Sequence, residues 1–301
     1  MKIFVVVPDI LNNGGIKTAA NWVRFLIDHK YDAILANGGG KPSAEWWNFK
    51  VPTCNFAQIE DAPENKAVYN WGPDIINTSR LQQIQKYYYA QDCAQPFYPA
   101  HEQFLPLMLK MKFGTIGHHS HWYYLYNYKI QSKIVNNFTD QEVFYPGEKV
   151  PNRLCMILHR EHYSGGVEQN LKTIGYDVVV ASGSQEDVAS AMRTSTFFLS
   201  MAPGVYDGYE MSEGFPLPIA EAMSCGCVVF CRDSNGVNEY MMDKVSGFFH
   251  DGNFGRIADK LGKIYKDQEY LKWIADNAYK TFKYRFTIQN TWEQMKEFLE
   301  I

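Results

Sequence analysis

Ser212-Glu-Gly-Phe-Pro-Leu-Pro-Ile-Ala-Glu-Ala-Met-Ser-Cys-Gly226 is the stretch that predicts most about this chain. Its prolines and the small apolar residues behind them indicate a turn that leads into a helix. Pro218 suits the first turn of that helix, because its missing N–H would have no helical partner there. Pro216 also lacks an N–H. The backbone donors that we expect to be free at the helix start are those of Phe215, Leu217, Ile219 and Ala220.

These donors and a carboxylate beside them form a predicted binding site. The start of a helix carries about half a positive charge, which favours an anion such as a diphosphate. Glu221 lies about one turn into the predicted helix, where it can accept hydrogen bonds from sugar hydroxyls. A nucleotide-sugar requires anion donors and hydroxyl acceptors side by side, so the stretch predicts a site for such a ligand.

Composition indicates a soluble enzyme. The chain has 301 residues, 46% of them hydrophobic and 15% aromatic, which is enough for a large core and most naturally two domains. A net charge of -4 does not suggest a nucleic-acid partner. The six cysteines show no extracellular framework, and neither a signal peptide nor an apolar run of membrane length is visible. We therefore expect a cytoplasmic protein with reduced thiols.

Strand and helix patterns alternate along the chain, which predicts parallel sheets covered by helices on both faces. Expected strands are residues 3–7, 31–36, 74–77, 87–90, 112–116, 154–158, 178–181, 196–200, 228–231 and 247–249. Expected helices in the second half are residues 167–174, 185–193, 237–243, 254–266, 268–279 and 288–299.

A cluster of Pro, Gly and charged residues at 145–151 marks a domain boundary. We predict an α/β protein with two Rossmann-like, doubly wound domains facing each other across a cleft, where ligands of such folds usually bind. The first domain covers residues 1–148 and the second covers residues 149–285. The last segment, 286–301, is an amphipathic helix that we expect to pack back on the first domain.

The 212–226 stretch, followed by an apolar strand and Asn235-Gly-Val-Asn-Glu239, resembles the signature of retaining GT-B glycosyltransferases of family 4. Seven residues separate Glu213 and Glu221, as in the Glu-x7-Glu pair of that family. The resemblance implies that Glu221 holds the ribose of the nucleotide and that Glu213 lies near the transferred sugar as a catalytic residue. It also implies that sugar and diphosphate are held by the backbone of Gly214, Phe215, Pro216 and Leu217.

The first domain carries two further similarities. Gly14 and Gly15, after the first strand, resemble the glycine loop of the family, which faces the donor phosphates and the acceptor. The stretch 87–98 resembles a subgroup that includes bacterial rhamnosyltransferases, and it places Gln91 and Asp92 at the carboxyl end of a strand. Asp92 either stabilises positive charge at the anomeric carbon, or binds acceptor hydroxyls, or only caps its loop.

The chain lacks one of the two positively charged residues of a family motif. The family usually shows Gly-Arg-x4-Lys-Gly after the first strand of the second domain, and its Arg and Lys neutralise the diphosphate. Arg160 keeps its place here, but Gly165 stands where the lysine is expected. Either another basic residue such as Lys17 substitutes, or glycine N–H groups do part of the work, or the enzyme is weak or inactive.

The remaining candidates are histidines and a membrane-facing segment. His118 and His119 are candidates for the acceptor side, where they would contact phosphate or acceptor. Zinc needs converging ligands of defined spacing, and the family generally works without a catalytic metal, so we expect neither metal nor cofactor. Residues 105–113, with Lys110 and Lys112, leave a peripheral membrane contact open, although no sustained basic face accompanies them.

The sequence therefore predicts a retaining transferase. It would move a hexosyl or deoxyhexosyl group from a nucleotide-diphosphate donor to a hydroxyl of a glycan or lipid-linked glycan. Two alternatives stay open: a nucleotide-sugar epimerase of the same fold, and a non-catalytic protein that only binds nucleotide-sugars.

Overall fold

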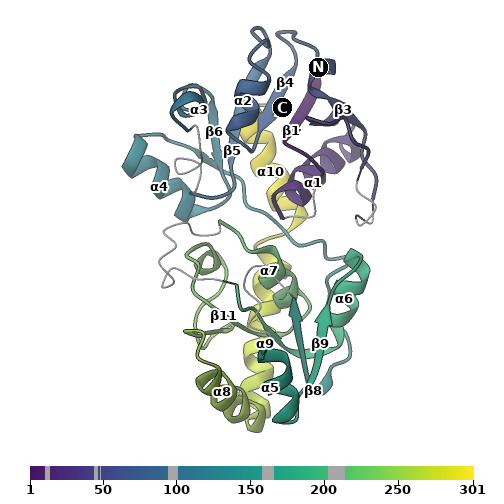
Figure 1. The fold of residues 1–301 in the computed structure, drawn as a ribbon, viewed down its shortest axis with the longest axis vertical. Coiled ribbons are helices and arrows are strands. Elements are labelled where there is room, and N and C mark those ends of the chain that lie inside the picture. Colours follow the sequence, from purple (N-terminus) through teal and green to yellow (C-terminus); the bar gives the residue numbers. More distant parts are fainter. Residues whose placement is uncertain (11–13, 44–46, 48, 94–100, 158–165, 203–213) are drawn as a thin grey trace. The chain divides into compact units, whose positions relative to one another are not determined.

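The computed structural model describes residues 1–10, 14–43, 47, 49–93, 101–157, 166–202 and 214–301. These residues form two compact units (Figure 1). The first unit contains Met1–Asn137 together with Thr291–Ile301, and the second contains Phe138–Asn290. Each unit is built on its own parallel sheet with helices packed against it, so the predicted α/β fold with two Rossmann-like halves is confirmed.

The first unit has a seven-stranded sheet in the order β3-β2-β1-β4-β5-β6-β7. Its strands are β1 (Lys2–Val7), β2 (Asp32–Asn37), β3 (Thr53–Asn55), β4 (Lys66–Tyr69), β5 (Gln85–Ala90), β6 (Lys112–Thr115) and β7 (Lys133–Ile134). Its helices are α1 (Gly14–Asp28), α2 (Pro73–Asn77), α3 (His101–Met108), α4 (His118–Tyr128) and most of α10 (Ile288–Leu299).

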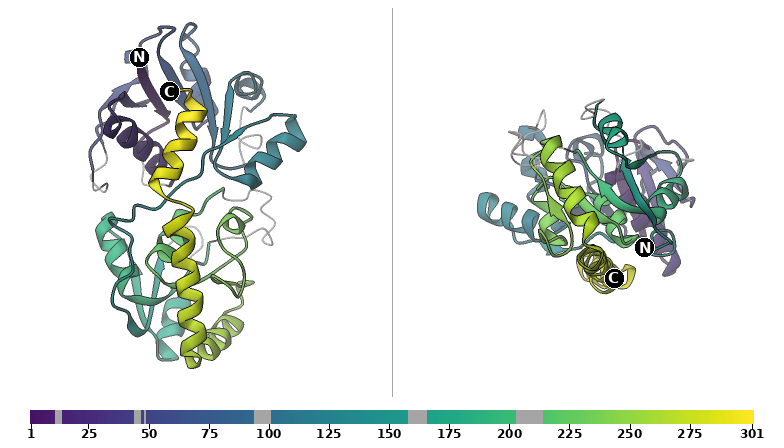
Figure 2. Two further views of the ribbon diagram at one scale, coloured as in Figure 1. Left: turned by 180° about the vertical axis from the view of Figure 1, so that it is seen from behind. Right: turned by 90° about the horizontal axis from the view of Figure 1, so that it is seen from below.

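Helix α10 returns to the first unit and packs on its sheet (Figure 2). The ring of Phe298 lies 5.5 Å from that of Tyr87, and the Tyr87 hydroxyl donates to the carbonyl of Leu299 over 3.2 Å. Gly114 in β6 makes this approach possible, because a Cβ there would lie 2.9 Å from the Phe298 ring. Burial of this large ring is a main contribution to holding the C-terminal helix on the first unit.

The second unit has a five-stranded parallel sheet in the order β12-β11-β10-β8-β9. Its strands are β8 (Val150–Ile157), β9 (Asp177–Ala181), β10 (Ser195–Leu199), β11 (Val228–Cys231) and β12 (Phe248–Phe249). Its helices are α5 (Val167–Thr173), α6 (Gln185–Thr194), α7 (Leu217–Ser224), α8 (Phe254–Lys266) and α9 (Gln268–Tyr284).

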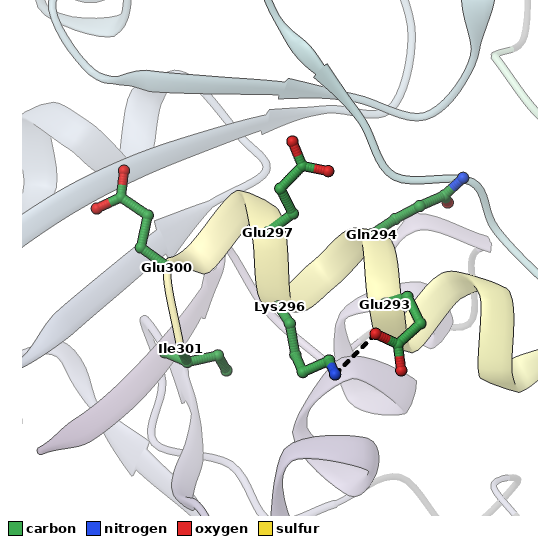
Figure 3. A pocket seen from close by; sticks show the side chains of 6 residues that line it. All are labelled: Glu293, Gln294, Lys296, Glu297, Glu300 and Ile301. Atoms are coloured by element: carbon green, nitrogen blue, oxygen red, sulfur yellow. Dashed lines mark ion pairs between the residues drawn. The ribbon is translucent and has the colours of Figure 1, made fainter.

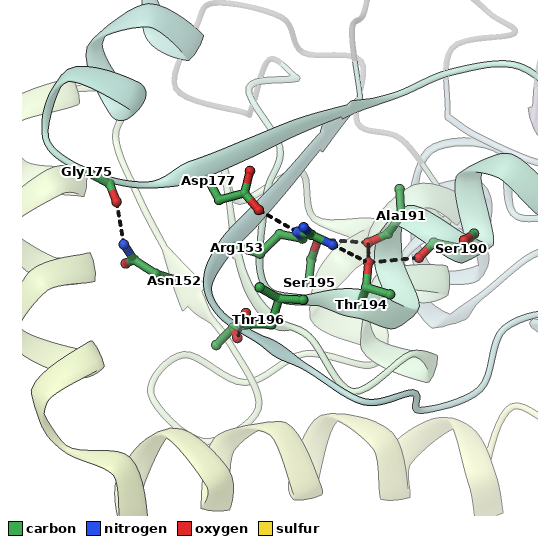
Figure 4. Close-up of polar contacts among 10 residues, drawn as sticks. Asn152, Arg153, Gly175, Asp177, Ser190, Ala191, Thr194, Ser195 and Thr196 are labelled. Atoms are coloured by element: carbon green, nitrogen blue, oxygen red, sulfur yellow. Dashed lines mark hydrogen bonds and ion pairs between the residues drawn. The ribbon is translucent and has the colours of Figure 1, made fainter.

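Polar contacts fasten the amino ends of β8, β9 and β10 (Figure 4). The Arg153 guanidinium donates to the carboxylate of Asp177 over 2.7 Å and to the hydroxyl of Thr194 over 3.3 Å. Ser195 in turn donates to the carbonyl of Ala191 over 2.8 Å. These bonds hold the strands together near their amino ends. The loops that follow β8 and β10 begin at the opposite, carboxyl ends.

Two expected elements are wrong in type or extent. Residues 74–77, expected as a strand, form helix α2, because Pro73 occupies its first turn and Asp74 suits the positive helix start. The neighbouring strand is β4, which was not expected. Residues 237–243 contain a single 3-10 turn, Gly236–Glu239, instead of a full helix. Among the described residues, no helix is long and apolar enough to cross a membrane.

Candidate functional site

The order of the strands locates the candidate ligand edge of the second unit. β8 lies between β9 and β10, so the chain steps to one side after β8 and crosses to the other side after β9. Open α/β sheets bind ligands outside the carboxyl ends of their strands, at such a reversal. The loops after β8 and β10 leave from this point, and they carry Arg160 and the 212–226 stretch.

The 212–226 stretch contains a helix, α7, as the sequence predicted, and the helix begins at Leu217. Pro216 is its N-cap residue and Pro218 lies in its first turn. The N–H of Ala220 donates to the carbonyl of Pro216 over 3.2 Å, so the expectation that Ala220 offers a free donor is wrong. This bond is the first of the helix. Leu217 and Ile219 precede it and find no acceptor within the helix, which makes their N–H groups the available donors.

The turn before α7 is fixed by Tyr240, which sequence reasoning missed. Its hydroxyl donates to the carbonyl of Pro216 over 2.9 Å. The ring of Phe215 packs 4.8 Å from the Tyr240 ring and 5.4 Å from the Phe286 ring. The Phe215 side chain is therefore an anchor in the core, and only its backbone is left for a ligand. The signal was present in the sequence, since Tyr240 directly follows the Asn235–Glu239 segment.

Glu221 lies in the second turn of α7 and is only 5% exposed. A carboxylate so deeply buried is uncommon, because charged side chains are costly to remove from water unless they have a partner. Gly214 and Leu217 are buried beside it at the same helix start. Glu213, Arg160 and Gly165 lie outside the described residues.

His250 ties together the carboxyl ends of three strands in this unit. Its Nε2–H donates to the carbonyl of Ser200 over 3.0 Å, and its Nδ1 accepts from the N–H of Gly252 over 3.0 Å. The backbone N–H of His250 donates to the carbonyl of Cys231. Burial lowers the pKa of the imidazole to about 4, so the ring is neutral at physiological pH. His250 was not predicted; only its place directly after a short strand hinted at it.

The first unit has its own reversal of strand order, between β1 and β4. The carbonyl of Gly15 accepts from the Gln91 amide over 3.2 Å and from the Asn70 amide over 3.5 Å. The chain segments after β1, β4 and β5 therefore meet at this point. Gly14 and Gly15 lie in the first turn of α1, where they were expected to form a loop ahead of the helix.

Asp92 and Asp74 are two carboxylates near this edge. Asp92 is half-buried, and its carbonyl accepts from the Tyr124 hydroxyl over 3.4 Å. Asp74 is 1% exposed. Burial raises the pKa of Asp74 to about 7; the Asn77 amide opposes this and the charge of Asp9 adds to it. Asp74 was not a predicted site residue because residues 74–77 read as a strand.

The histidine candidates lie at the start of α4. His118 is exposed and His119 is half-buried. His121, one turn along, has its Nδ1 2.8 Å from the hydroxyl of Ser132. Within the described parts of the chain, no three His, Cys, Asp or Glu side chains converge as metal ligands.

Two surface hollows lie away from these edges. One follows the outer face of α10 and is lined by Glu293, Lys296, Glu297 and Glu300 (Figure 3), and each of its glutamates is paired with a lysine. The other, about 370 Å³, lies at the amino ends of β8 and β10. Lys149 lines it, but its ammonium already donates to the carbonyl of Cys225 over 2.7 Å. Neither hollow lies at the helix start that offers the N–H groups of Leu217 and Ile219.

The fold is that of the GT-B glycosyltransferases. The Anabaena protein HepE, solved with UDP and glucose, superposes with a TM-score of 0.75 at 14% identity, over 100% of this chain and 99% of that one. Sucrose-phosphate synthase from Thermosynechococcus elongatus gives a TM-score of 0.72 at 12% identity, over 99% and 98% of the two chains.

The second unit also matches at the level of sequence. Residues 172–281, which lie within the second unit, match the family model described as glycosyl transferases group 1. The matched range contains α7 and its turn. Sucrose synthase 5 of Arabidopsis thaliana is 37% identical over 71 residues, which are 22% of this chain and 8% of the relative. The similarity thus spans a small fraction of that relative's length.

Proposed function

We propose that this protein is a retaining glycosyltransferase of family 4 that takes a nucleotide-diphosphate sugar as its donor. One observation carries the proposal. The α7 turn, with its free N–H groups and the buried Glu221, lies at the reversal of strand order in the second unit and within the range matched by the family. A diphosphate fits the positive helix start, and a ribose fits the carboxylate one turn further.

Different groups of the site bind the diphosphate, the sugar and the ribose of the donor. The N–H groups of Leu217 and Ile219 receive the diphosphate together with Arg160, and the backbone of Gly214 and Phe215 holds the sugar. Glu221 accepts hydrogen bonds from the ribose hydroxyls. Because HepE was solved with UDP and glucose, UDP-sugars are the first donors to test.

Departure of the nucleotide is the step that the α7 turn assists. The bond between the anomeric carbon and the diphosphate oxygen breaks, and negative charge grows on the leaving phosphate. Preorganised N–H donors at that oxygen are worth roughly 10²–10³ in rate each. The acceptor hydroxyl then attacks the same face, and its proton passes to the leaving phosphate, so no protein nucleophile is needed. Glu213 stabilises the reacting sugar.

The first unit contributes the acceptor side. Gln91 already fixes the carbonyl of Gly15, and Asp92 follows it directly, so Asp92 is the carboxylate that we assign to acceptor hydroxyls. His118 and His119 are assigned to the acceptor as well. The acceptor is a glycan or lipid-linked glycan, and the reaction uses no metal. All six cysteines are buried and free, which suits a reducing compartment such as the cytoplasm.

Proton NMR of the reaction mixture separates this function from its alternatives. The protein is incubated with each UDP-sugar alone and with a panel of glycan acceptors, with and without EDTA. A retaining transferase gives a new glycoside with the anomeric configuration of the donor, equally fast in EDTA. Interconversion of the sugar without acceptor would instead identify an epimerase. Binding by calorimetry without any turnover would identify a non-catalytic nucleotide-sugar binder.

A further inference from the structure

Helix α4 presents two large aromatic rings to solvent. Trp122 is 49% exposed and Tyr126 is 69% exposed. They lie one helical turn apart, and their rings stack with centroids 5.7 Å apart. The opposite face of the helix is anchored by Ser120 and Tyr124, which are 1% and 0% exposed. The outward direction of the two aromatic rings is therefore a fixed feature of the fold.

Helix α3 carries a further exposed apolar side chain. It lies beside α4 on the same side of the first unit in both side views (Figures 1 and 2). Leu107 on α3 is 40% exposed. Trp122, Tyr126 and Leu107 account for most of the large exposed hydrophobic side chains that the described residues of this unit present. Exposed rings that stack on one another, as those of Trp122 and Tyr126 do, mark an interaction surface.

The charge of this region is opposite to that of the chain. The chain has a net charge of -4, yet no Asp or Glu occurs between Glu102 and Asp140, where four lysines and three histidines stand. Two of the lysines, Lys112 and Lys133, pair with glutamates of α10. Lys110 and Lys129 have no carboxylate within ion-pair distance in the described parts of the chain. The uncompensated charge of the α3–α4 region is positive.

We propose that α3 and α4 dock this protein on an anionic lipid surface. Trp and Tyr rings suit the boundary between headgroups and acyl chains, where one end of the ring is apolar and the other is wet. Lys110 and Lys129 complement the negative surface potential of anionic phospholipids. Between Glu102, in the first turn of α3, and the end of α4 the chain carries lysines and no carboxylate, a charge pattern that a neutral glycan would not require and an anionic bilayer would favour. The charge pattern therefore selects the lipid.

The test is cosedimentation of the full chain with vesicles, without donor. One set of vesicles contains phosphatidylcholine alone, and the other contains phosphatidylcholine with phosphatidylglycerol. The unaltered protein sediments with the anionic vesicles at low salt and is released at high salt, because salt screens the lysine charges. Trp122→Ala combined with Tyr126→Ala lowers the partition coefficient by about tenfold. Lys110→Gln combined with Lys129→Gln removes the preference for phosphatidylglycerol.

The chain offers a matched control on α9 of the second unit. Trp273 and Tyr284 are 48% and 67% exposed, close to the values of Trp122 and Tyr126. Trp273→Ala with Tyr284→Ala leaves vesicle binding unchanged if the α3–α4 surface is the docking site. Equal thermal unfolding of all variants shows that they fold.

Three results would overturn the proposal: no sedimentation of the unaltered protein with anionic vesicles, full binding by the Trp122 and Tyr126 double variant, or equal loss in the α9 control. Retention on immobilised oligosaccharides together with no vesicle binding would assign the rings to a glycan instead. None of these results depends on turnover of a nucleotide-sugar, so failure here is distinct from failure of the proposed transferase.

Discussion

Replacing His250 by Gln should make the second unit less sensitive to acid. In the folded protein the ring accepts from the N–H of Gly252 at Nδ1, the atom that a second proton would occupy. Protonation breaks this bond and places a charge in a buried site. Burial lowers the pKa of His250 to about 4, against an ordinary value of 6.5, and the charge of Arg232 adds to this effect.

The magnitude follows from these two values. The unfolded chain binds the proton as pH falls through the ordinary value, while the folded chain resists it until about pH 4. Acid therefore favours unfolding, and the stability that neutral His250 contributes is present above pH 6.5 and is lost as pH falls towards 4. Linkage gives a loss of about 2 kcal/mol between about pH 7.5 and about pH 5.

Urea unfolding at a series of pH values measures this loss, with hydrogen exchange of peptides from β10 and β11 to report on the second unit alone. His250→Gln keeps a donor towards the carbonyl of Ser200 and has no proton to gain, so its stability should fall by about 2 kcal/mol less over that range. The exposed His118→Gln variant should behave like the unaltered protein. An identical pH dependence in the His250 variant would refute the reasoning.

Three further substitutions test other contacts. Tyr240→Phe removes the donor to the carbonyl of Pro216 but keeps the ring, so urea unfolding should show a loss of about 1 kcal/mol and calorimetry a several-fold weaker donor affinity. Lys149→Met leaves the carbonyl of Cys225 without its ammonium donor and should cost about 1–3 kcal/mol in thermal unfolding. Asp74→Asn should stabilise the protein by up to about 4 kcal/mol near pH 8, because burial raises the pKa of Asp74 to about 7 and so disfavours its ionised form in the folded protein, and the gain should vanish below about pH 4. Unchanged stability in any of these variants would show that the contact or buried group named for it does not contribute to the stability of the protein as described.

The parts of the fold that the sequence predicts are those with a local cause. β1 and β11 are short apolar runs that are buried throughout, apart from Lys2, and α8 and α10 show one apolar face at helical spacing. β4 has no such signal, because it begins at Lys66, a lysine that is 4% exposed. The Tyr87 hydroxyl, 21 residues away, accepts from its ammonium over 2.9 Å. A partner so distant in sequence cannot be read from a local pattern.

The residues of the candidate site also fall into those that local sequence predicts and those that depend on distant contacts. The spacing of prolines and glutamates predicts where α7 starts and where Glu221 lies, because both depend on residues within one turn of each other. Tyr240 and His250 act mainly through contacts with Pro216 and Ser200, 24 and 50 residues away, so their sequence neighbours give only a weak signal for them. Ala220 was assigned wrongly because its N–H is used by the first bond of the helix, and that bond depends on where α7 begins.

The central claim is that the α7 turn and Glu221 bind the donor. Calorimetric titration of UDP-sugars into the unaltered protein and into Glu221→Gln tests it most directly. A carboxylate that accepts from ribose hydroxyls contributes about 1.5–3 kcal/mol, so the variant should bind about 10–100-fold more weakly. Glu269→Gln, on an exposed turn of α9, should bind like the unaltered protein. Equal affinity in the Glu221 variant and the unaltered protein would contradict the account.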